Sequence, residues 1–351
     1  MFRTLLSGLV ALTWILASPA MAQTRLFADD KPLQMTITAP FPVLVATAKN
    51  SMPRYPGALT VSEGSGPAQT IPIQLRARGL TRRTAGFCLF PPLQLDFDDK
   101  DALKGTPFKG QHKLKLVTYC HNQPDYEQRI ILEYLVYKLY NVITPMSFRV
   151  RGAEVTYRKD ANDTGVTRFG YMIEDLSDVA GRNGFKELNY KSRAIGAGQL
   201  DAHAAGRAAL LEFMIGNLDW DFLAAPVGAT CCHNSRFIAR SDALPLKAVV
   251  PIAYDFDYSG WVDSPYAGPP IGIPIEFVTQ RYYRGYCVST AEMPAVIAEF
   301  RAHRAEMTAL VADNPRLNAK FRDKTVKYLD GFFTLLDDPA RVQKEIINHC
   351  R

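Results

Sequence analysis

Beyond its first 22 residues the chain has no apolar run long enough to cross a bilayer, which takes about 20 consecutive apolar residues. It has no block of lysine or arginine of the kind that binds nucleic acid, and its formal charge of +6 is mild for 351 residues. It also has no internal repeat, no low-complexity tract and no Gly-x-Gly-x-x-Gly loop. We therefore expect no later membrane span and no nucleic-acid partner.

The first 22 residues have the pattern of a cleavable secretory signal peptide. Arg3 supplies positive charge, residues 5–17 are apolar, and Ala20-Met21-Ala22 is a small-x-small cleavage site. We expect delivery to the periplasm or secretion. All six cysteines follow this segment, and an even number in an oxidising compartment predicts disulfide bonds. The adjacent Cys231 and Cys232 are expected to bridge two different partners.

Hydrophobic periodicity changes along the chain from strand-like to helical. The first half predicts one helix at 126–140 among strands at 36–38, 70–78, 89–97, 112–119, 147–151, 154–157 and 169–173. The second half predicts helices at 204–215 and over most of 291–349, with breaks near Pro315 and Pro339 and a short strand at 249–253.

We therefore divide the chain into a signal peptide (1–22), an N-terminal extension with the first strands (23–69), a β-rich lobe (70–174) and a helical lobe (175–351). The expected class is α+β with two lobes, the β-rich one carrying one inserted helix. Ligands commonly bind between such layers.

Basic residues of the β-rich half suit phosphate. The densest basic patch of the chain is Arg76, Arg78, Arg82 and Arg83. In the strand 113–117 the lysines share one face and the aliphatic residues the other, so Lys113 or Lys115 is available to hold phosphate. An acidic residue of the following helix, Glu127 or Glu133, is expected to orient that lysine.

Acidic and amide residues of the second half suit metal-assisted phosphate chemistry. Asp219 follows the first strong apolar helix, His233-Asn234 comes shortly after, and Asp255 ends a short apolar strand. Mg²⁺ and Mn²⁺ prefer hard oxygen ligands, which Asn234 and Asp255 supply. Asp219 would serve as the base that receives the proton of an acceptor.

These motifs resemble, in the same order, those of the CotH-type kinase family. The resemblance spans about residues 70–262 and rests on Arg78-Gly79-Leu80-Thr81-Arg82-Arg83, His112-Lys113-Leu114-Lys115-Leu116, Arg129–Leu139, Phe169-Gly170-Tyr171-Met172-Ile173-Glu174-Asp175, Gly216-Asn217-Leu218-Asp219-Trp220 and Tyr254-Asp255-Phe256-Asp257. The segment 222–232 is an insert between Asp219 and Asn234, and a disulfide from Cys231 or Cys232 would pin it.

The resemblance implies a bilobal protein-kinase-like fold and an exported phosphotransferase that uses ATP, or another nucleotide, with Mg²⁺ or Mn²⁺. By position, it implies a catalytic role for Asp219, metal binding by Asn234 and Asp255, and nucleotide binding by Arg78, Lys113, Lys115, Glu133, Ile173 and Glu174, with adenine meeting the backbone near Ile173-Glu174. The acceptor would be a protein or a small molecule that the sequence does not identify.

Three other hypotheses remain open at this level. A catalytically silent binding or interaction protein of the cell envelope fits an exported chain, because ATP is scarce outside the inner membrane. A carboxylate-pair hydrolase would use Asp219 with Asp221 or Asp255. A zinc site would take its ligands from Cys231, Cys232, His233 and Cys287.

Overall fold

The protein is described by a computed structural model that covers residues 25–62, 66–84, 86–189 and 191–351. The expected signal peptide and its cleavage site lie outside these residues. In the described part no helix is both long and apolar enough to cross a membrane.

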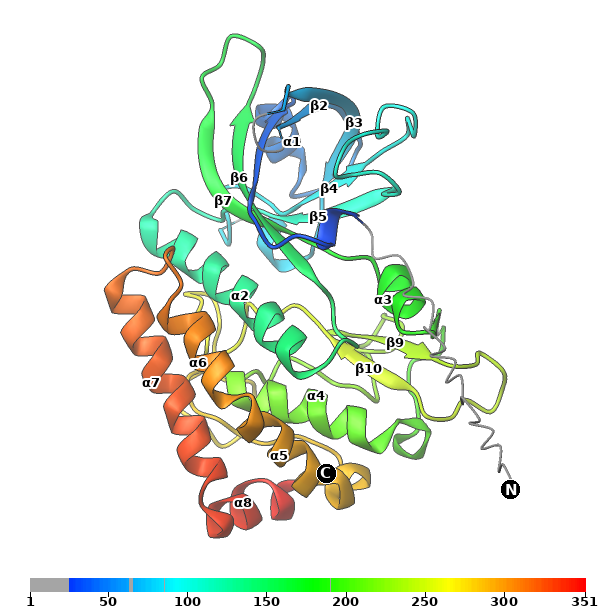
Figure 1. Cartoon of the computed structure of the whole chain (residues 1–351), viewed down its shortest axis with the longest axis vertical. Helices are drawn as coiled ribbons and strands as arrows, with labels where there is room; N and C mark the ends of the chain where they lie inside the picture. Colours follow the sequence, from blue (N-terminus) through cyan, green and yellow to red (C-terminus); the bar gives the residue numbers. More distant parts are fainter. Residues whose placement is uncertain (1–24, 63–65, 85, 190) are drawn as a thin grey trace, which may run out of the picture.

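The first half of the described chain forms a closed barrel of mixed strands (Figure 1). Around the barrel the strands follow the order β1-β2-β3-β4-β5-β7-β6. The β1–β6 pairing is parallel and closes the barrel, while the other neighbours pair antiparallel. The strands are β1 (Leu33–Thr38), β2 (Tyr55–Ser62), β3 (Gln69–Ala77), β4 (Leu93–Asp96), β5 (Lys113–Val117), β6 (Val150–Arg158) and β7 (Val166–Ile173).

Period-two alternation fills the barrel with side chains. In β5, Leu114 and Leu116 are buried in the barrel core while Lys113 and Lys115 point outward, as the sequence pattern predicted. The strands predicted at 147–151 and 154–157 are one continuous strand, β6. Its Gly152 faces the ring of Phe169 so closely that a Cβ atom would lie 2.9 Å from it.

The predicted bilobal protein-kinase-like fold is wrong, although the α+β class is right. A sheet of the predicted kind keeps two free edges, whereas here β1 pairs with β2 on one side and with β6 on the other. The sequence pattern fixes which residues of a strand face inward, but not which strands pair at the ends of the sheet. Closure therefore escaped prediction.

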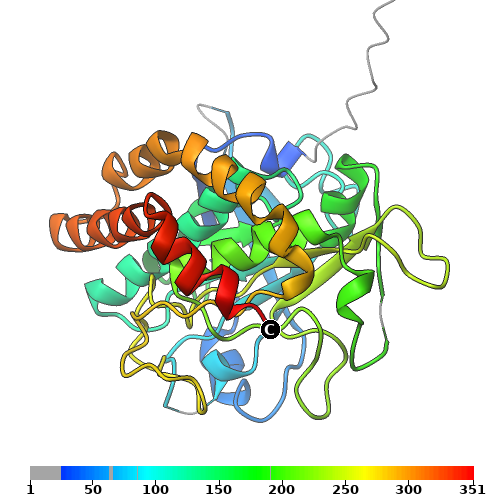
Figure 2. The ribbon, with the colours of Figure 1, turned by 90° about the horizontal axis from the view of Figure 1, so that it is seen from below.

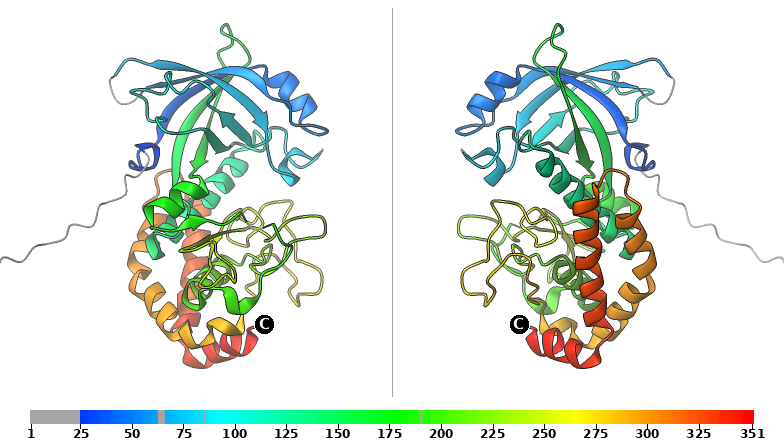
Figure 3. Two further views of the ribbon diagram at one scale, coloured as in Figure 1. Left: turned by 90° about the vertical axis from the view of Figure 1, so that its right-hand side faces the viewer. Right: turned by 90° about the vertical axis from the view of Figure 1, so that its left-hand side faces the viewer.

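The second half of the chain is mainly helical and packs below the barrel (Figure 3). Its larger elements are α3 (Leu176–Arg182), α4 (Ala202–Ile215), α5 (Met293–Ala302), α6 (Arg304–Ala312), α7 (Ala319–Leu336) and α8 (Pro339–Glu345). Figure 2 shows α5, α6 and α7 outside α4. The helices predicted at 204–215 and over 291–349 are confirmed, and α6 and α7 end shortly before Pro315 and Pro339.

The helix predicted at 126–140 is confirmed as α2 (Pro124–Ile143), but it belongs to the core of the helical half. Its buried residues, including Ile131, Leu135 and Leu139, pack in the same cluster as α4 and α7. A second helix, α1 (Phe41–Thr47), covers the barrel and was not predicted. Because α2 is fixed in the larger core, its residues provide rigid contact points for the segments that meet the barrel.

A small three-stranded sheet lies between the barrel and the helices. Its order is β10-β9-β8, formed by β8 (Lys186–Glu187), β9 (Ser235–Ala239) and β10 (Val250–Ala253). β9 and β10 are antiparallel, with Ser235 opposite Ala253. The residue before β9 and the residues after β10 therefore lie at the same end of the hairpin.

Three disulfides confirm the prediction from the cysteine count, and no cysteine of the described residues is free. Cys88–Cys120 joins the loop after the basic patch to the segment after β5, and Cys287–Cys350 ties the last residues to the segment before α5. The expectation of two separate partners for Cys231 and Cys232 is wrong, because they are bonded to each other.

A buried ion cluster joins the barrel to the helical half. Arg82, in the short 3-10 turn Thr81–Arg83, donates to Glu133 of α2 at 2.5 Å and to Asp257 after β10 at 2.9 Å. These three residues are at most 7% exposed. Tyr266 also donates to Asp257, at 2.9 Å. Glu133 therefore orients Arg82, and not a strand lysine as predicted.

We predict that Arg82→Met destabilises the protein by about 3–5 kcal/mol, because it leaves two buried carboxylates without a counter-charge. Guanidinium denaturation measures the loss. Arg83→Met is the matched control, since the hydrogen bonds of the Arg83 side chain to other described residues go to the carbonyls of Gly79 and Ala48.

Neutralising the whole cluster in Arg82→Met/Glu133→Gln/Asp257→Asn should restore part of the stability, because no buried charge is then unpaired. Equal losses in the Arg82 and Arg83 single variants would contradict the prediction.

Candidate functional site

The turn after α4 positions Asp219. Gly216 ends the helix in the left-handed conformation, and a Cβ atom there would lie 2.3 Å from the hydroxyl oxygen of Tyr328. The Asn217 side chain then accepts from the Asp219 N–H at 3.1 Å, and the Asn217 carbonyl accepts from the Trp220 indole at 3.0 Å. The sequence Gly-Asn-x-Asp-Trp is thus a compact turn that presents one carboxylate.

The Asp219 carboxylate is held by two residues that precede β9. His233 Nε2 lies 2.7 Å from Oδ1, and Asn234 Nδ2 donates to Oδ2 at 3.0 Å and to the Asp219 carbonyl at 2.6 Å. The hydrogen bond to Asp219 raises the pKa of His233. The Asp219 side chain is still 40% exposed. The structure thus joins two predicted site residues that are 15 positions apart.

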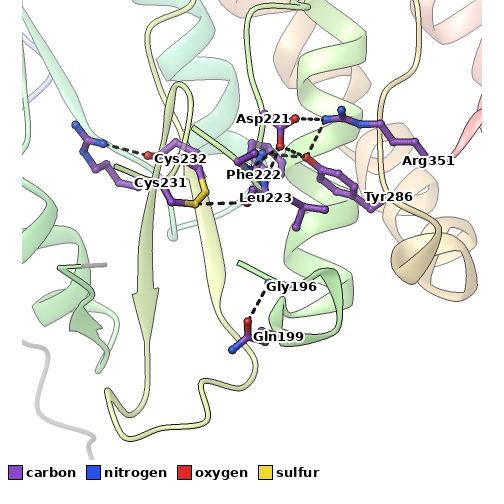
Figure 4. The surroundings of a disulfide bond; sticks show 12 residues. Gly196, Gln199, Asp221, Phe222, Leu223, Cys231, Cys232, Tyr286 and Arg351 are labelled. Carbon is purple, nitrogen blue, oxygen red and sulfur yellow. Dashed lines mark hydrogen bonds and ion pairs between the residues drawn. A yellow bond between two sulfur atoms is a disulfide. The ribbon is translucent and has the colours of Figure 1, made fainter. Parts of the chain in front are cut away.

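The insert 222–232 returns to Asp219 without a disulfide to another element. The Asp221 N–H donates to the His233 carbonyl at 3.1 Å, which closes the loop at its base. On the other side Asp221 accepts from Tyr286 at 2.8 Å and pairs with Arg351 at 3.0 Å (Figure 4). Backbone pairing and Asp221 therefore do what the sequence assigned to a disulfide from Cys231 or Cys232.

Asn234 and Asp255 lie side by side at one end of the β9–β10 hairpin. The Tyr254 N–H donates to the Asn234 carbonyl at 3.1 Å. Both residues have a left-handed backbone, with φ of 49° and 68°, which is uncommon outside glycine. The Asp255 N–H donates to the hydroxyl of Tyr137 on α2 at 3.0 Å. Such backbone strain is concentrated at functional sites, where surrounding contacts hold it in place.

Asp255 lies in an excess of negative charge. The residue is exposed to solvent, although many protein atoms lie around its carboxyl group. Burial, with Asp257 and Glu133 as neighbouring carboxylates, raises the pKa of Asp255 to about 7 in spite of Arg82 and Arg78. A bound cation would relieve this excess.

Lys115, and not Lys113, faces the site. Lys113 is exposed and lies 3.5 Å from Asp175. Lys115 is half-buried, and its ammonium lies 5.8 Å from the ring centroid of Phe148 and 6.0 Å from that of Tyr254. Within the described chain no carboxylate is within 4 Å of it. Burial lowers the pKa of Lys115 to about 8, and nearby Arg78 adds to the effect.

Two further cations stand beside Lys115. Arg78 interacts electrostatically with both Lys115 and Asp255, and its guanidinium has no hydrogen-bond partner within the ranges that the structure describes. Arg236 of β9 lies 4.9 Å from the Tyr254 ring centroid. Lys115 and Arg236 thus lie 6.0 and 4.9 Å from the Tyr254 ring centroid, next to Asp255 in the chain.

The residues predicted to meet adenine, Ile173 and Glu174, and the alternative glutamate, Glu127, make contacts with residues outside the candidate site. Ile173 is paired with both Lys115 and Val150, and the Glu174 N–H donates to the Arg149 carbonyl at 3.0 Å. The Glu174 carboxylate is buried and bound by Arg182 at 3.0 Å. Glu174 therefore has a structural role here, and its N–H is not free. Glu127 interacts with Arg168 and Arg316 and not with the site.

Sequence analysis missed two residues at this site and the role of a third. Arg236 follows Asn234 by two positions, and Tyr137 lies one helical turn after Glu133, so helical and strand spacing were the available signals. His233 was noticed as the neighbour of Asn234 and as a hypothetical zinc ligand, but not as a partner of Asp219. Its bond to Asp219 depends on the return of the insert, for which spacing holds no signal.

The described residues contain no group of three or more His, Cys, Asp or Glu side chains placed to share a metal ion. The hypothetical zinc ligands Cys231, Cys232 and Cys287 are all in disulfides. Asn234 and Asp255 suit magnesium better, since this ion takes one or two protein oxygens and completes its shell with water and phosphate. The Asn234 amide nitrogen is used by Asp219, which leaves its oxygen for a ligand.

Comparison with known proteins does not assign the chain to a family, because no protein-family model and no curated protein matches it.

Proposed function

We propose that this chain is an exported phosphotransferase that binds ATP or another nucleotide with Mg²⁺ or Mn²⁺, its acceptor being a protein or small molecule. One observation carries the proposal. Two cations that form no close ion pair in the described chain, Arg78 and Lys115, adjoin a set of oxygen groups, Asp219, Asn234 and Asp255, contributed by separate segments. Phosphoryl transfer needs this combination of cations, metal ligands and an acceptor-binding carboxylate.

Each residue has a defined task in this proposal. Lys115 and Arg78 hold phosphate oxygens, and both remain available because no carboxylate of the described residues forms a close ion pair with either, although Asp175 interacts with Lys115 at longer range. Asp255 and Asn234 would hold the metal, which neutralises the charge of the phosphates when bound. His233 and Asn234 orient Asp219, which accepts a hydrogen bond and then the proton of the acceptor.

The motifs of this chain resemble those of the CotH-type kinase family in the same order, and this likeness supports the proposal. We propose the likeness for the site and not for the barrel. The three disulfides fit export to an oxidising compartment, the periplasm or the exterior.

A silent binding protein is the second candidate, favoured by one observation. Both oxygens of the Asp219 carboxylate already take part in hydrogen bonds, with His233 and Asn234. A carboxylate fixed in this way has less freedom to accept a proton. The carboxylate-pair hydrolase is less favoured, because it gives no task to Lys115 and Arg78.

We predict that ATP with Mn²⁺ raises the melting temperature of the wild type. At about 100 times Kd the complex gains about 2.7 kcal/mol. Lys115→Met and Asp255→Asn should each lose most of this shift. Lys113→Met, on the same strand but paired with Asp175, should keep it. A shift of the same size in Lys115→Met and in the wild type would contradict the phosphate role.

We predict that Asp219→Asn lowers turnover of the ATP γ-phosphate by about 100-fold or more and keeps the melting shift, because general acid–base groups contribute about 10²–10⁴-fold to rate. Release of labelled phosphate, or its transfer to the protein, measures turnover. If the wild type binds ATP and Mn²⁺ but turns over no faster than the variant, the silent-binding candidate replaces the enzyme.

We predict that Lys115→Met, without nucleotide, is more stable than the wild type by on the order of 1 kcal/mol at pH 7. Folding lowers the pKa of Lys115 from 10.5 to about 8, so the folded state carries an uncompensated charge at neutral pH. Between about pH 8 and 10.5 the unfolded chain binds more protons, and wild-type stability rises relative to the variant.

Urea denaturation at pH 7, 9 and 10.5 measures the difference, which should shrink as the pH rises. A constant difference, or a less stable variant at pH 7, would contradict the unpaired charge.

A further inference from the structure

A pocket that contains none of the candidate site residues lies between α7 and the loop that follows β10; its Tyr328 is the residue whose hydroxyl adjoins Gly216. Its volume is about 740 Å³, which is within the range of about 300–1,000 Å³ found for small-molecule sites. It is lined by Asp263, Ala267, Pro269, Glu276, Phe277, Val278, Thr279, Arg281, Lys324, Lys327, Tyr328 and Gly331.

Part of the lining is apolar and open to solvent. Phe277 is 64% exposed, and the lining also contains Ala267, Pro269 and Val278. An exposed aromatic side chain beside other apolar residues in a concave surface favours a ligand that covers it. The apolar part of a ligand would lie here.

The same lining holds a guanidinium without a paired carboxylate among the described residues, that of Arg281. Arg281 stacks on the ring of Tyr328 at 3.8 Å and donates to the carbonyls of Met214 and Tyr328 at 2.9 and 2.7 Å. Burial lowers its pKa, and no carboxylate within the described ranges pairs with it. Both hydrogen bonds use Nε and Nη2, so Nη1 keeps its donors. A mostly buried cation that lacks an anion is costly, and a bound anion removes that cost.

Lysine side chains on α7 add to the preference of the pocket for an anion. Lys327 has no ion-pair partner in the described part of the chain, whereas Lys324 is paired with Asp263 at 2.7 Å. Glu276 is the remaining acidic side chain of the lining. The charged lining residues without an ion pair in the described chain are thus two cations, Arg281 and Lys327, and one anion, Glu276. The pocket is therefore positive overall.

A glycine keeps the anion position open. Gly331 lies inside α7, where glycine costs about 0.5–1 kcal/mol relative to alanine. A Cβ atom there would lie 3.7 Å from Arg281 Nη1, and a longer side chain would extend into the space beside the guanidinium. The small residue thus leaves the free donors of Arg281 accessible.

We propose that this pocket binds a small amphipathic anion, a molecule with an apolar body and one carboxylate. The carboxylate pairs with Arg281 Nη1 and Lys327, and the apolar body covers Phe277 and Val278. The proposal is independent of the proposed phosphotransferase function, because it uses none of the residues of that site.

Isothermal titration of the full chain with two probes, decanoate and 2-naphthoate, tests this proposal. The two probes share the carboxylate and differ in the apolar body, so they distinguish an aliphatic from an aromatic ligand. We expect saturable one-to-one binding of at least one probe below about 1 mM, and at least tenfold weaker binding of the matching neutral alcohol.

Two variants place the binding in the pocket. Lys327→Glu should weaken the better probe by about tenfold or more, whereas Lys320→Glu, on the same helix but outside the lining, should not change it. Gly331→Leu should abolish binding by filling the space beside Arg281, while Gly331→Ala should retain it.

Circular dichroism and melting curves confirm that each variant is folded before titration. No saturable binding of either probe to the wild type, equal binding of the alcohols, or unchanged affinity in both Lys327→Glu and Gly331→Leu would overturn the proposal.

Discussion

The ion cluster of Arg82, Glu133 and Asp257 is the interaction on which the arrangement of the site depends. It joins the barrel, α2 and the segment after β10 with two hydrogen bonds of 2.5 and 2.9 Å in a buried environment. Two carboxylates share one guanidinium, so the cluster is negative overall. Asp255 lies two residues from Asp257 and therefore experiences this excess. The same contacts hold the fold together and set the charge of the candidate metal ligand.

The candidate site is built where chain segments end. Asp219 follows α4, Asn234 precedes β9 and Asp255 follows β10. Ends of elements leave backbone and side chains free of the regular ladders, and here two of them adopt a left-handed backbone without glycine. The cost of that conformation is offset by contacts from rigid elements, such as the Tyr137 hydroxyl on α2. For Asp255, both the position and the backbone strain thus depend on the placement of α2 in the larger core.

Cations without a paired carboxylate among the described residues are common to the two candidate sites. Lys115 and Arg78 beside Asp255, and Arg281 in the pocket under α7, are partly or mostly buried cations without a carboxylate partner in the described chain. By contrast, the side chains of Arg82 and Arg182 are buried and paired with carboxylates. Since desolvating a charge costs several kcal/mol, the cations at both places favour ligands that are themselves anions.

The sequence by itself determined the α+β class, the long helices, the lysine-bearing strand and the choice of Asp219, Asn234 and Asp255 as candidate site residues, because periodicity and residue chemistry are local properties. The tertiary structure alone decided barrel closure, since β1 pairs with β6, which lies far from it along the chain. It also decided that Glu133 pairs with Arg82 and that Lys115, not Lys113, faces the site. These outcomes depend on which side chains meet across distant segments, and no local pattern contains that information.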